Sequence, residues 1–178
     1  ETLERAERDL GVPAEIIVAI IGVETYYGRI TGSYRVLDAL STLAFEYPKR
    51  SPFFTRELIN YILLTREQGV DPRSLKGSYA GAMGYGQFMP SSYRNYAIDF
   101  DDDGAIDIWN NPVDAIGSVA NYFKAHGWQT GQAVVSPARA GSDVAERWFN
   151  AGLQPEHTVA EFAAAGIEAV DPVAADAK

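Results

Sequence analysis

The stretch that decides how this chain folds is VAIIGVETYYGR, residues 18–29. It overlaps an apolar run, Ile16 to Val23, that ends at a single carboxylate, Glu24, followed by a threonine, two tyrosines and a glycine. A run with apolar residues on every side is typical of a helix inside a domain rather than on its surface. The pattern predicts such a buried helix over residues 13–27, with a proline in its first turn.

Glu24 follows Ile17, Ile20 and Ile21 by seven, four and three positions, so we expect its side chain on the same helical face as these isoleucines. Removing an ionised carboxylate from water is unfavourable, and burial raises the pKa of a glutamate. We therefore expect Glu24 to be buried and to hold its proton near neutral pH, as a general acid does.

The neighbours of Glu24 favour a bound ligand. Tyr26 and the tyrosine after it offer flat amphipathic surfaces, and Gly28 permits a close approach of the backbone. These features suit a carbohydrate bound beside an acid, with Tyr26 as a substrate-binding residue. An alternative places Glu24 at a solvated helix end, or in an ion pair with Arg29 or Arg35.

The composition limits the classes of protein to which this chain can belong. With 178 residues, 47% hydrophobic and 22% charged, the chain fits one globular domain with a small appendage. Its formal charge of -9 would repel a polyphosphate backbone, so we expect no nucleic-acid partner. Cysteine is absent, which removes disulfides and thiol chemistry. Because Glu1 begins directly in a helical pattern, we expect the chain to come from a longer precursor.

Helical periodicity dominates the chain up to residue 128. We predict a mainly α (α+β) fold, with a helical core over residues 1–128 and a small α/β appendage over residues 129–178. The expected elements are helices at 3–10, 36–47 and 52–68, from Pro90, and between Asn111 and Gly127, then a short strand within 132–140 and weak helices at 144–151 and 159–165.

A glycine-rich loop, GSYAGAMGYGQFMP at residues 77–90, interrupts this periodicity. It lacks the Walker and Gly-x-Gly-x-x-Gly patterns, so we do not predict a phosphate site. One interpretation is a tight structural turn. The other is a sugar-binding loop, in which the backbone passes close to the ligand at the glycines while Ser78 and Gln87 present a hydroxyl and an amide.

The acidic segment DFDDDGAIDIWN, which begins at Asp99, matches an EF-hand calcium loop through its ninth position. Asp99, Asp101 and Asp103 occupy positions 1, 3 and 5, a glycine follows at 6, and the Ala105 carbonyl stands at 7. Position 12, normally a bidentate glutamate, is Asn110. The segment predicts a calcium site that lacks one usual ligand. A solvated acidic turn is the alternative, although its aspartates repel one another without a cation.

Three stretches together carry a resemblance to a known family. They are GVETYYGRITGSYRVLDALSTLAFEYPKR (22–50), GSYAGAMGYGQFMPSSY (77–93) and WNNPVDAIGSVANYFKAHGW (109–128). Their combination is similar to the soluble and membrane-bound lytic transglycosylase B family of bacteria, glycoside hydrolase family 103. The resemblance implies a lysozyme-like core of the periplasm or cell envelope that acts on peptidoglycan. It would cut the β-1,4 bond between N-acetylmuramic acid and N-acetylglucosamine and leave 1,6-anhydromuramoyl ends.

The resemblance also implies roles for particular residues. Glu24 matches the family's single catalytic glutamate, which protonates the glycosidic oxygen and then takes the proton of the muramoyl C6 hydroxyl as that oxygen attacks C1. Because an internal hydroxyl replaces water, one carboxylate serves where ordinary glycosidases need two. Ser78 and Gln87 match residues near that glutamate and the glycan. Tyr122 matches a tyrosine of the cleft, with core packing as its alternative role.

Asp114 matches the aspartate with which similar loops of this family close the calcium site. The resemblance therefore implies a structural calcium ion held by an EF-hand-like loop at 99–114, although Asp114 could instead cap the helix that follows Asn111. Family members usually continue into a further helix that completes the cleft, so we expect residues 129–178 to be incomplete at the C-terminus. We also expect a monomer, with two alternatives for the parent protein: a soluble form, or association with the outer membrane through a lipid anchor absent from this chain.

Two other functions fit the same residues. A hydrolytic muramidase would use water as the nucleophile, and a non-catalytic module would bind peptidoglycan in a calcium-dependent manner. The first alternative predicts reducing ends in the product in place of anhydro ends, and the second predicts no cleavage.

Overall fold

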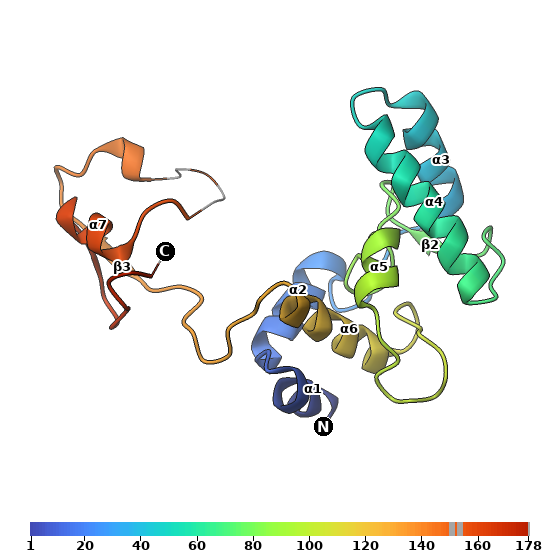
Figure 1. Cartoon of the computed structure of the whole chain (residues 1–178), viewed down its shortest axis with the longest axis horizontal. Helices are drawn as coiled ribbons and strands as arrows, with labels where there is room; N and C mark the ends of the chain where they lie inside the picture. The colour runs from blue at the N-terminus through green and yellow to red at the C-terminus, as the bar shows by residue number, and fades with distance from the viewer. Residues whose placement is uncertain (150–151, 153–154, 178) are drawn as a thin grey trace. The chain divides into compact units, whose positions relative to one another are not determined.

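The computed structural model describes residues 1–149, 152 and 155–177. Contacts divide the chain into two compact units, Glu1–Thr130 and Gly131–Lys178 (Figure 1). The change in sequence texture predicts a boundary near residue 129. The first unit contains every residue proposed above for catalysis, glycan binding or calcium binding.

Helices account for most of the first unit, which confirms the predicted mainly helical fold (Figure 1). A short antiparallel pair, in which Tyr34 lies opposite Gly77, joins the segment before α3 to the start of the glycine-rich loop. The elements are α1 (Thr2–Leu10), α2 (Ala14–Thr25), β1 (Tyr34–Arg35), α3 (Val36–Glu46), α4 (Ser51–Glu67), β2 (Lys76–Gly77), α5 (Pro90–Tyr96) and α6 (Pro112–Ala125).

The helices of the first unit form two groups. Helices α1, α2 and α6 pack on one another, and α3 packs along α4, while the short α5 contacts both α4 and α6. Figure 1 shows α3 and α4 side by side as a hairpin, with α5 between this hairpin and α6. The largest side chains buried in the core include Ile17, Leu40, Tyr61, Met83 and Ile108. The glycine-rich and acidic loops therefore contribute core residues of their own, Met83 and Ile108.

Helix ends follow the local sequence signals. Gly11 closes α1 in the left-handed conformation with φ of 76°, and Pro90 begins α5 at its first turn. The side chain of Asn111 caps α6 by accepting a hydrogen bond from the backbone N–H of Val113.

Helix α2 is buried on one face only, so the predicted burial of this helix on every side is wrong. Ile17, Ile21 and Thr25, spaced four residues apart, face the core. Val23 is 84% exposed. The physical reason is that, among the helices of the described residues, α1 and α6 are the ones that pack closely on α2, and they leave the rest of its surface uncovered.

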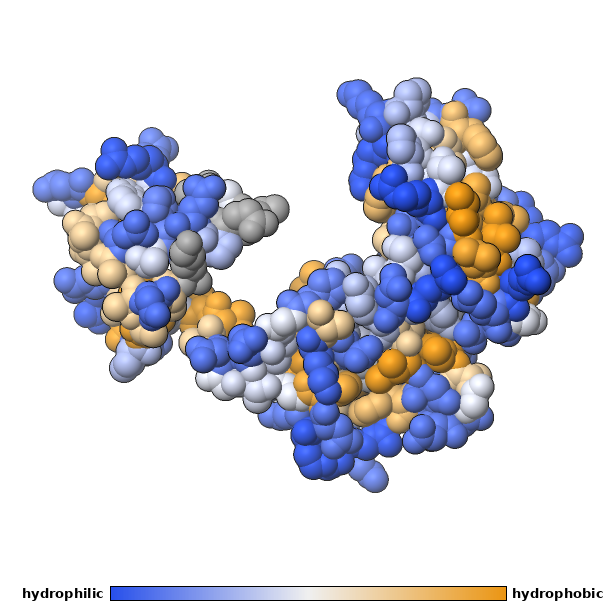
Figure 2. Space-filling view, viewed as in Figure 1, coloured by the Kyte–Doolittle hydropathy of each residue, from blue (hydrophilic) through white to orange (hydrophobic). Residues whose placement is uncertain are grey.

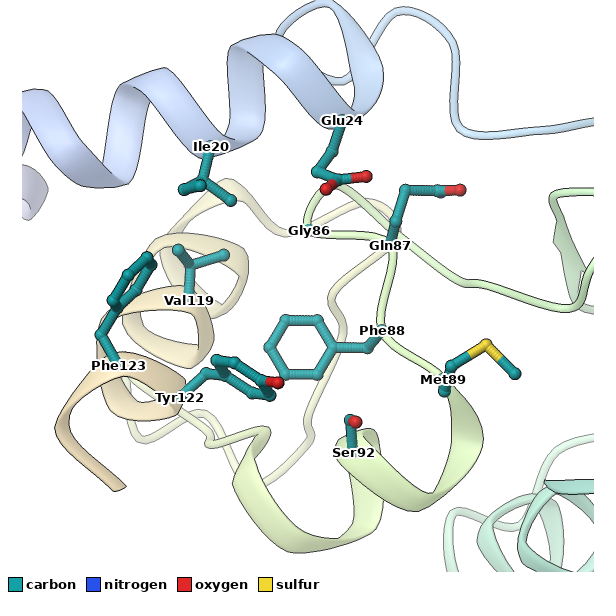
Figure 3. A pocket seen from close by; sticks show the side chains of 10 residues that line it. All are labelled: Ile20, Glu24, Gly86, Gln87, Phe88, Met89, Ser92, Val119, Tyr122 and Phe123. Atoms are coloured by element: carbon teal, nitrogen blue, oxygen red, sulfur yellow. The ribbon is translucent and has the colours of Figure 1, made fainter. Parts of the chain in front are cut away.

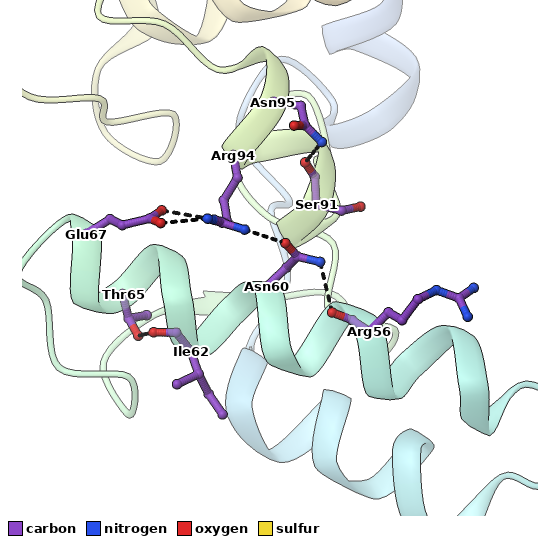
Figure 4. Close-up of polar contacts among 8 residues, drawn as sticks. All are labelled: Arg56, Asn60, Ile62, Thr65, Glu67, Ser91, Arg94 and Asn95. Carbon is purple, nitrogen blue, oxygen red and sulfur yellow. Dashed lines mark hydrogen bonds and ion pairs between the residues drawn. The ribbon is translucent and has the colours of Figure 1, made fainter.

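Polar contacts fix α5 on α4 (Figure 4). Arg94 of α5 donates two hydrogen bonds to the carboxylate of Glu67, at 2.9 and 2.6 Å, and a third to Asn60 at 2.7 Å. The buried carboxylate of Glu57 accepts hydrogen bonds from the backbone N–H and the hydroxyl of Ser91, at 2.9 and 2.8 Å. These contacts orient α5, whose residues border the pocket described below.

The Glu67–Arg94 pair predicts an acid-sensitive contribution to stability. Hydrogen bonds from Arg94 lower the pKa of Glu67 below its ordinary 4.5, against a smaller opposing effect of desolvation. A lowered folded-state pKa stabilises the protein above pH 4.5, and this stabilisation is lost as the pH falls through the folded value. We expect Glu67→Gln to lower the free energy of unfolding near neutral pH and to match the parent chain in acid. Denaturant unfolding across pH measures this, with the exposed Glu46→Gln as control; an equal loss at every pH would contradict it.

The second unit is small. Strand β3 (Ala138–Ala140) pairs antiparallel with β4 (Ile167–Ala169), and α7 (Val159–Ala164) begins with a capping box of Thr158 and Glu161. The weak helix expected at 144–151 is a short 3-10 turn, η1 (Glu146–Trp148), and residues 150 and 151 lie outside the described residues.

The surface of the first unit is partly apolar. Phe45 on α3 and Ile59 and Ile62 on α4 are more than half exposed, and Figure 2 shows orange residues over this hairpin. Even so, no helix within the described part of the chain has the length and hydropathy needed to cross a bilayer.

Candidate active site and acidic loop

A pocket of about 290 Å³ opens between α2, the glycine-rich loop, α5 and α6 (Figure 3). Most of its lining is apolar, with a few polar groups, which is the usual character of a ligand site. The lining residues are Ile20, Glu24, Gly86, Gln87, Phe88, Met89, Ser92, Val119, Tyr122 and Phe123.

Glu24 lines this pocket from the last turn of α2, and its carboxylate lies beside the amide side chain of Gln87 (Figure 3). The side chain is exposed, so the predicted burial of Glu24 is wrong. The residue after it, Thr25, occupies the buried position and is 1% exposed. Ile20 and Glu24, four residues apart, face the pocket, because the core-facing stripe passes through Ile21 and Thr25 instead.

The end of α2 has an unusual backbone. Tyr26 and Tyr27 both adopt the left-handed conformation, with φ of 50° and 59°, which costs a non-glycine residue about 1–2 kcal/mol. The hydroxyl of Thr25 stabilises this turn by accepting a hydrogen bond from the N–H of Gly28 at 3.0 Å. It also lies 2.9 Å from the carbonyl oxygen of Tyr85, in the glycine-rich loop. Helix α2 therefore ends in a tight turn directly after Thr25.

The glycine-rich loop is a tightly packed structure. Met83 and Phe88 exchange backbone hydrogen bonds of 2.9 Å each, and Gly84 has φ of 68°. A Cβ atom at Gly84 would stand 2.5 Å from the Ile108 carbonyl, so a larger residue would collide with the acidic loop. The structural interpretation of this glycine is thus supported, while Gly86 borders the pocket.

Gln87 is held in a left-handed conformation with φ of 50° at the tip of this loop. Its side-chain Nε2 donates to the carbonyl oxygens of Thr31 and Gly84, at 3.2 and 3.1 Å. In this assigned orientation both amide protons point into the protein, and the amide oxygen remains available to a ligand.

Ser78 lies at the base of the loop, apart from the residues that line the pocket. Its Oγ accepts hydrogen bonds from the N–H groups of Ala80 and Ala82, at 3.3 and 3.1 Å. The hydroxyl proton is not used in either bond. The observed contacts hold the loop in shape, and contact with a glycan stays a prediction.

We expect Ser78→Ala to destabilise the first unit by about 1–2 kcal/mol, because two partly buried N–H groups lose their acceptor. Denaturant unfolding measures this loss, and Ser33→Ala, at an exposed serine of a nearby loop, is the matched control. Equal midpoints for the two variants would show that these contacts contribute nothing to stability.

The two predicted tyrosines differ in position. Tyr122 of α6 lines the pocket and packs edge-on against Phe88, with ring centroids 5.7 Å apart. Tyr26 lies outside the pocket lining and is 55% exposed, with the guanidinium carbon of Arg29 5.0 Å from its ring centroid. Both remain predicted glycan contacts, one inside the pocket and one beside its acid.

Several pocket residues were not singled out by sequence reasoning. Phe88, Met89, Ser92 and Phe123 contribute apolar surface and one hydroxyl. Their patterns are those of ordinary loop and core residues, and only the packing of α5 against α6 brings them together. Phe88 and Met89 follow Gln87 directly, which is the one local signal that could have found them.

The acidic loop gathers three carboxylates. Oxygen atoms of Asp99, Asp101 and Asp114 lie within 4.8 Å of one another. Asp114 is fully buried, and its two oxygens accept hydrogen bonds from the N–H groups of Phe100 and Asp107, at 2.7 and 2.8 Å. Asp114 thus joins the two ends of the loop. These two hydrogen bonds give its carboxylate this role in place of the capping role considered above.

The charges of this group favour a cation. Desolvation raises the pKa of Asp114 above its ordinary 3.8; the hydrogen bonds from Asp107 and Phe100 lower it, and the negative charges of Asp101 and Asp99 raise it further. Each carboxylate oxygen has two lone pairs, so those that accept backbone hydrogen bonds can also meet a cation. Three carboxylates suit a hard ion such as calcium.

The other predicted ligands, Asp103 and Ala105, lie along the same loop, as does Asp107 at its ninth position. Asp103 accepts a hydrogen bond from the N–H of Ala105 at 2.9 Å, and it stands outside the three-carboxylate group formed by the described residues. Asp107 accepts hydrogen bonds from the N–H groups of Trp109 and Asn110, both at 2.9 Å. Calcium ligation by Asp103 and the Ala105 carbonyl stays a prediction.

Comparison with known proteins identifies the family. The model of the transglycosylase SLT domain matches residues 1–178. Membrane-bound lytic murein transglycosylase B of Escherichia coli is 51% identical over 97% of this chain and 46% of its own length. The structure of the soluble lytic transglycosylase SltB1 of Pseudomonas aeruginosa matches with a TM-score of 0.92 and 60% identity, over 96% of this chain and 57% of that one. The structure of lytic transglycosylase Slt35 of Escherichia coli, solved in complex with calcium, matches with a TM-score of 0.84 and 51% identity, over 96% of this chain and 53% of that one.

This chain therefore spans about half the length of the relatives it matches. The match nevertheless covers both of its units, and the helical fold it shares with them carries the pocket and the acidic loop. The resemblance read from the three sequence stretches is confirmed. The chain belongs to the transglycosylase SLT domain family, among its lytic transglycosylases of the B type.

Proposed function

We propose that the protein is a lytic transglycosylase that cleaves the glycan strands of peptidoglycan between N-acetylmuramic acid and N-acetylglucosamine. The observation that carries this proposal is that Glu24 is the one carboxylate among the described residues that line the pocket. A hydrolase of the usual kind needs a second carboxylate for water or for a covalent intermediate. The family assignment and the name of the relative from Escherichia coli support the same activity.

In the first step, Glu24 donates its proton to the oxygen of the glycosidic bond as the bond to the muramoyl C1 breaks. The N-acetylglucosamine portion leaves as an alcohol, and positive charge develops at C1. A glycan in the pocket displaces water from its surroundings, and desolvation favours the protonated form of a carboxyl group. Binding of the substrate itself thus prepares the acid for donation.

In the second step, the C6 hydroxyl of the same muramoyl residue attacks C1, and the carboxylate of Glu24 accepts the hydroxyl proton. The product has a 1,6-anhydro ring, and Glu24 regains its proton for the next cycle. An intramolecular nucleophile is favoured over water because its effective concentration is very high. The apolar lining of Ile20, Val119 and Phe123 limits competing water near the reaction.

The other predicted residues bind the glycan in this proposal. The free amide oxygen of Gln87 accepts a hydrogen bond from a sugar hydroxyl or amide group, and Tyr122 offers the face of its ring within the pocket. Tyr26 extends this surface beyond the pocket. Ser78, at the base of the glycine-rich loop, donates its unused hydroxyl proton to the glycan.

The acidic loop binds calcium in this proposal, with Asp99, Asp101 and Asp114 as ligands and Asp103 and the Ala105 carbonyl completing the set. The calcium complex of the Slt35 relative supports this assignment. The ion is structural, because it would neutralise repelling carboxylates and join the loop to α6 without contact to the glycan.

The cellular location of the protein follows from its proposed substrate, peptidoglycan. We propose that the protein works as a monomer in the periplasm, in association with the outer membrane of the cell envelope. The description of the Escherichia coli relative as membrane-bound supports this association.

Product analysis tests the function. Purified peptidoglycan sacculi are digested with the 178-residue chain and with the longest form of the protein that contains it, and the released muropeptides are analysed by mass spectrometry. The expected products are lighter than the corresponding reducing-end fragments by one water. Reducing ends would instead assign the hydrolytic mechanism, and binding to sacculi without release by either form would assign a non-catalytic module.

A further inference from the structure

Thr25 is the most deeply buried polar group next to the proposed acid. It is 1% exposed, and its hydroxyl lies between three elements of the first unit. The Oγ1 atom is 2.9 Å from the carbonyl oxygen of Tyr85 and 3.1 Å from that of Ile21, and it accepts a hydrogen bond from the N–H of Gly28 at 3.0 Å. A hydroxyl has one proton to donate. The shorter contact, to Tyr85, crosses from α2 to the glycine-rich loop.

The Tyr85 peptide is itself held in place from two sides. The N–H of Tyr85 donates to the carbonyl oxygen of Ile108 at 3.0 Å, so the acidic loop anchors the residue whose carbonyl Thr25 contacts. The Tyr85 ring packs over Gly28, where an added Cβ would stand 2.6 Å from it. Tyr85, whose carbonyl Thr25 contacts, is therefore held in place by two further contacts.

The two residues linked by this hydrogen bond lie close in sequence to Glu24 and Gln87, two of the polar residues that line the pocket. Thr25 follows Glu24 directly, and Tyr85 precedes Gln87 by two positions. Without the hydroxyl, the end of α2 and the glycine-rich loop lose a direct polar connection. The left-handed turn at Tyr26 and Tyr27 would also lose the contact to Gly28.

We propose that Thr25 is a positioning residue, whose hydroxyl holds the carboxylate of Glu24 at the correct distance from Gln87 and from the glycan bound between them. Thr25 does not touch the substrate; it acts through Glu24 and the Tyr85 carbonyl. Misplacement of a catalytic group by about 1 Å can cost about 100-fold in rate. Loss of the hydroxyl should therefore reduce kcat more than it weakens glycan binding.

Because this inference rests on the proposed function, the experiment begins with the parent protein and Glu24→Gln. Both are assayed on soluble glycan strands for the rate at which anhydro ends form. If the parent makes no anhydro ends, or Glu24→Gln keeps its rate, the proposed function fails. If the parent makes anhydro ends and Glu24→Gln does not, the role of Thr25 is tested in this parent enzyme, whose activity depends on Glu24.

Thr25→Val keeps the shape of the side chain and removes the hydroxyl, and Thr25→Ser keeps the hydroxyl. We expect Thr25→Val to lower kcat about 10- to 100-fold with KM within about threefold, and Thr25→Ser to restore kcat to within about threefold. Thr65→Val is the matched control: Thr65 is 3% exposed and its hydroxyl bonds to Ile62 inside α4, away from the pocket (Figure 4). The control should keep kcat and KM.

Two results would overturn the role of Thr25. One is a folded Thr25→Val variant with the kcat of the parent, and the other is a Thr25→Ser variant as slow as Thr25→Val. If Thr25→Val does not fold, Thr25→Ala and Thr25→Ser are compared at low temperature, where the two differ by the hydroxyl alone. Equal kcat values in that pair would reject the role as well.

Discussion

Replacing Glu24 by glutamine is expected to reduce the rate of anhydro-end formation by about 10²–10⁴-fold, the range typical for loss of a general acid or base. Glutamine has nearly the same shape as glutamate, but its amide can neither protonate the glycosidic oxygen nor accept the C6 hydroxyl proton. Both proposed steps depend on this one carboxylate, so no neighbour can supply the missing function. The measurement is the initial rate on sacculi, with products separated and identified by mass.

The matched control for this variant is Glu15→Gln. Glu15 is an exposed glutamate in the first turn of the same helix, far along α2 from the pocket, and its replacement should leave the rate unchanged. Binding of Glu24→Gln to sacculi should persist, because the pocket lining is intact. A Glu24→Gln variant with more than a tenth of the parent rate would contradict the assignment of Glu24 as the acid.

Replacing Asp114 by alanine is expected to have the largest effect on stability. The substitution leaves the N–H groups of Phe100 and Asp107 without an acceptor at a fully buried site, at a cost of about 1–3 kcal/mol each. It also removes one of three grouped carboxylates. We expect both a lower melting temperature and a much smaller response to calcium.

Calorimetry with and without calcium measures both effects. At calcium concentrations about 100 times the dissociation constant, binding should stabilise the parent by about 2.7 kcal/mol, and the Asp114→Ala variant by far less. The control is Asp102→Asn, at an exposed residue of the same loop whose positive φ of 60° asparagine tolerates. An equal calcium response in the parent and Asp114→Ala would place the ion elsewhere.

Local signals in the sequence were sufficient to predict most of the helical fold. Gly11, Pro90 and Asn111 mark helix ends through backbone chemistry that acts over a few residues, and all three ends are observed. The burial of α2 was predicted wrongly because periodicity reports which residues are apolar, whereas burial depends on which neighbours pack there. A helix with apolar residues all round can still border an open pocket.

The site was predictable in part. Glu24, Gln87 and Tyr122 come together in the pocket from three distant segments, and here the family resemblance supplied what spacing alone could not. Asp114 was likewise reached only through the resemblance, since it lies beyond the twelve positions of the loop pattern. No pattern pointed to Thr25, because a threonine in a helix has many ordinary roles and its partner, the Tyr85 carbonyl, is sixty residues away.

The pair of left-handed tyrosines after Glu24 has a consequence for protein engineering. Glycine at either position would relieve the backbone strain, so a design aimed only at heat resistance would choose it. Such a design would also remove an aromatic ring from the turn that directly follows Glu24 and Thr25, and would allow the polypeptide there more freedom. Thermal robustness and turnover should therefore respond in opposite directions at Tyr26 and Tyr27, which makes these two sites unsuitable for consensus-style stabilisation.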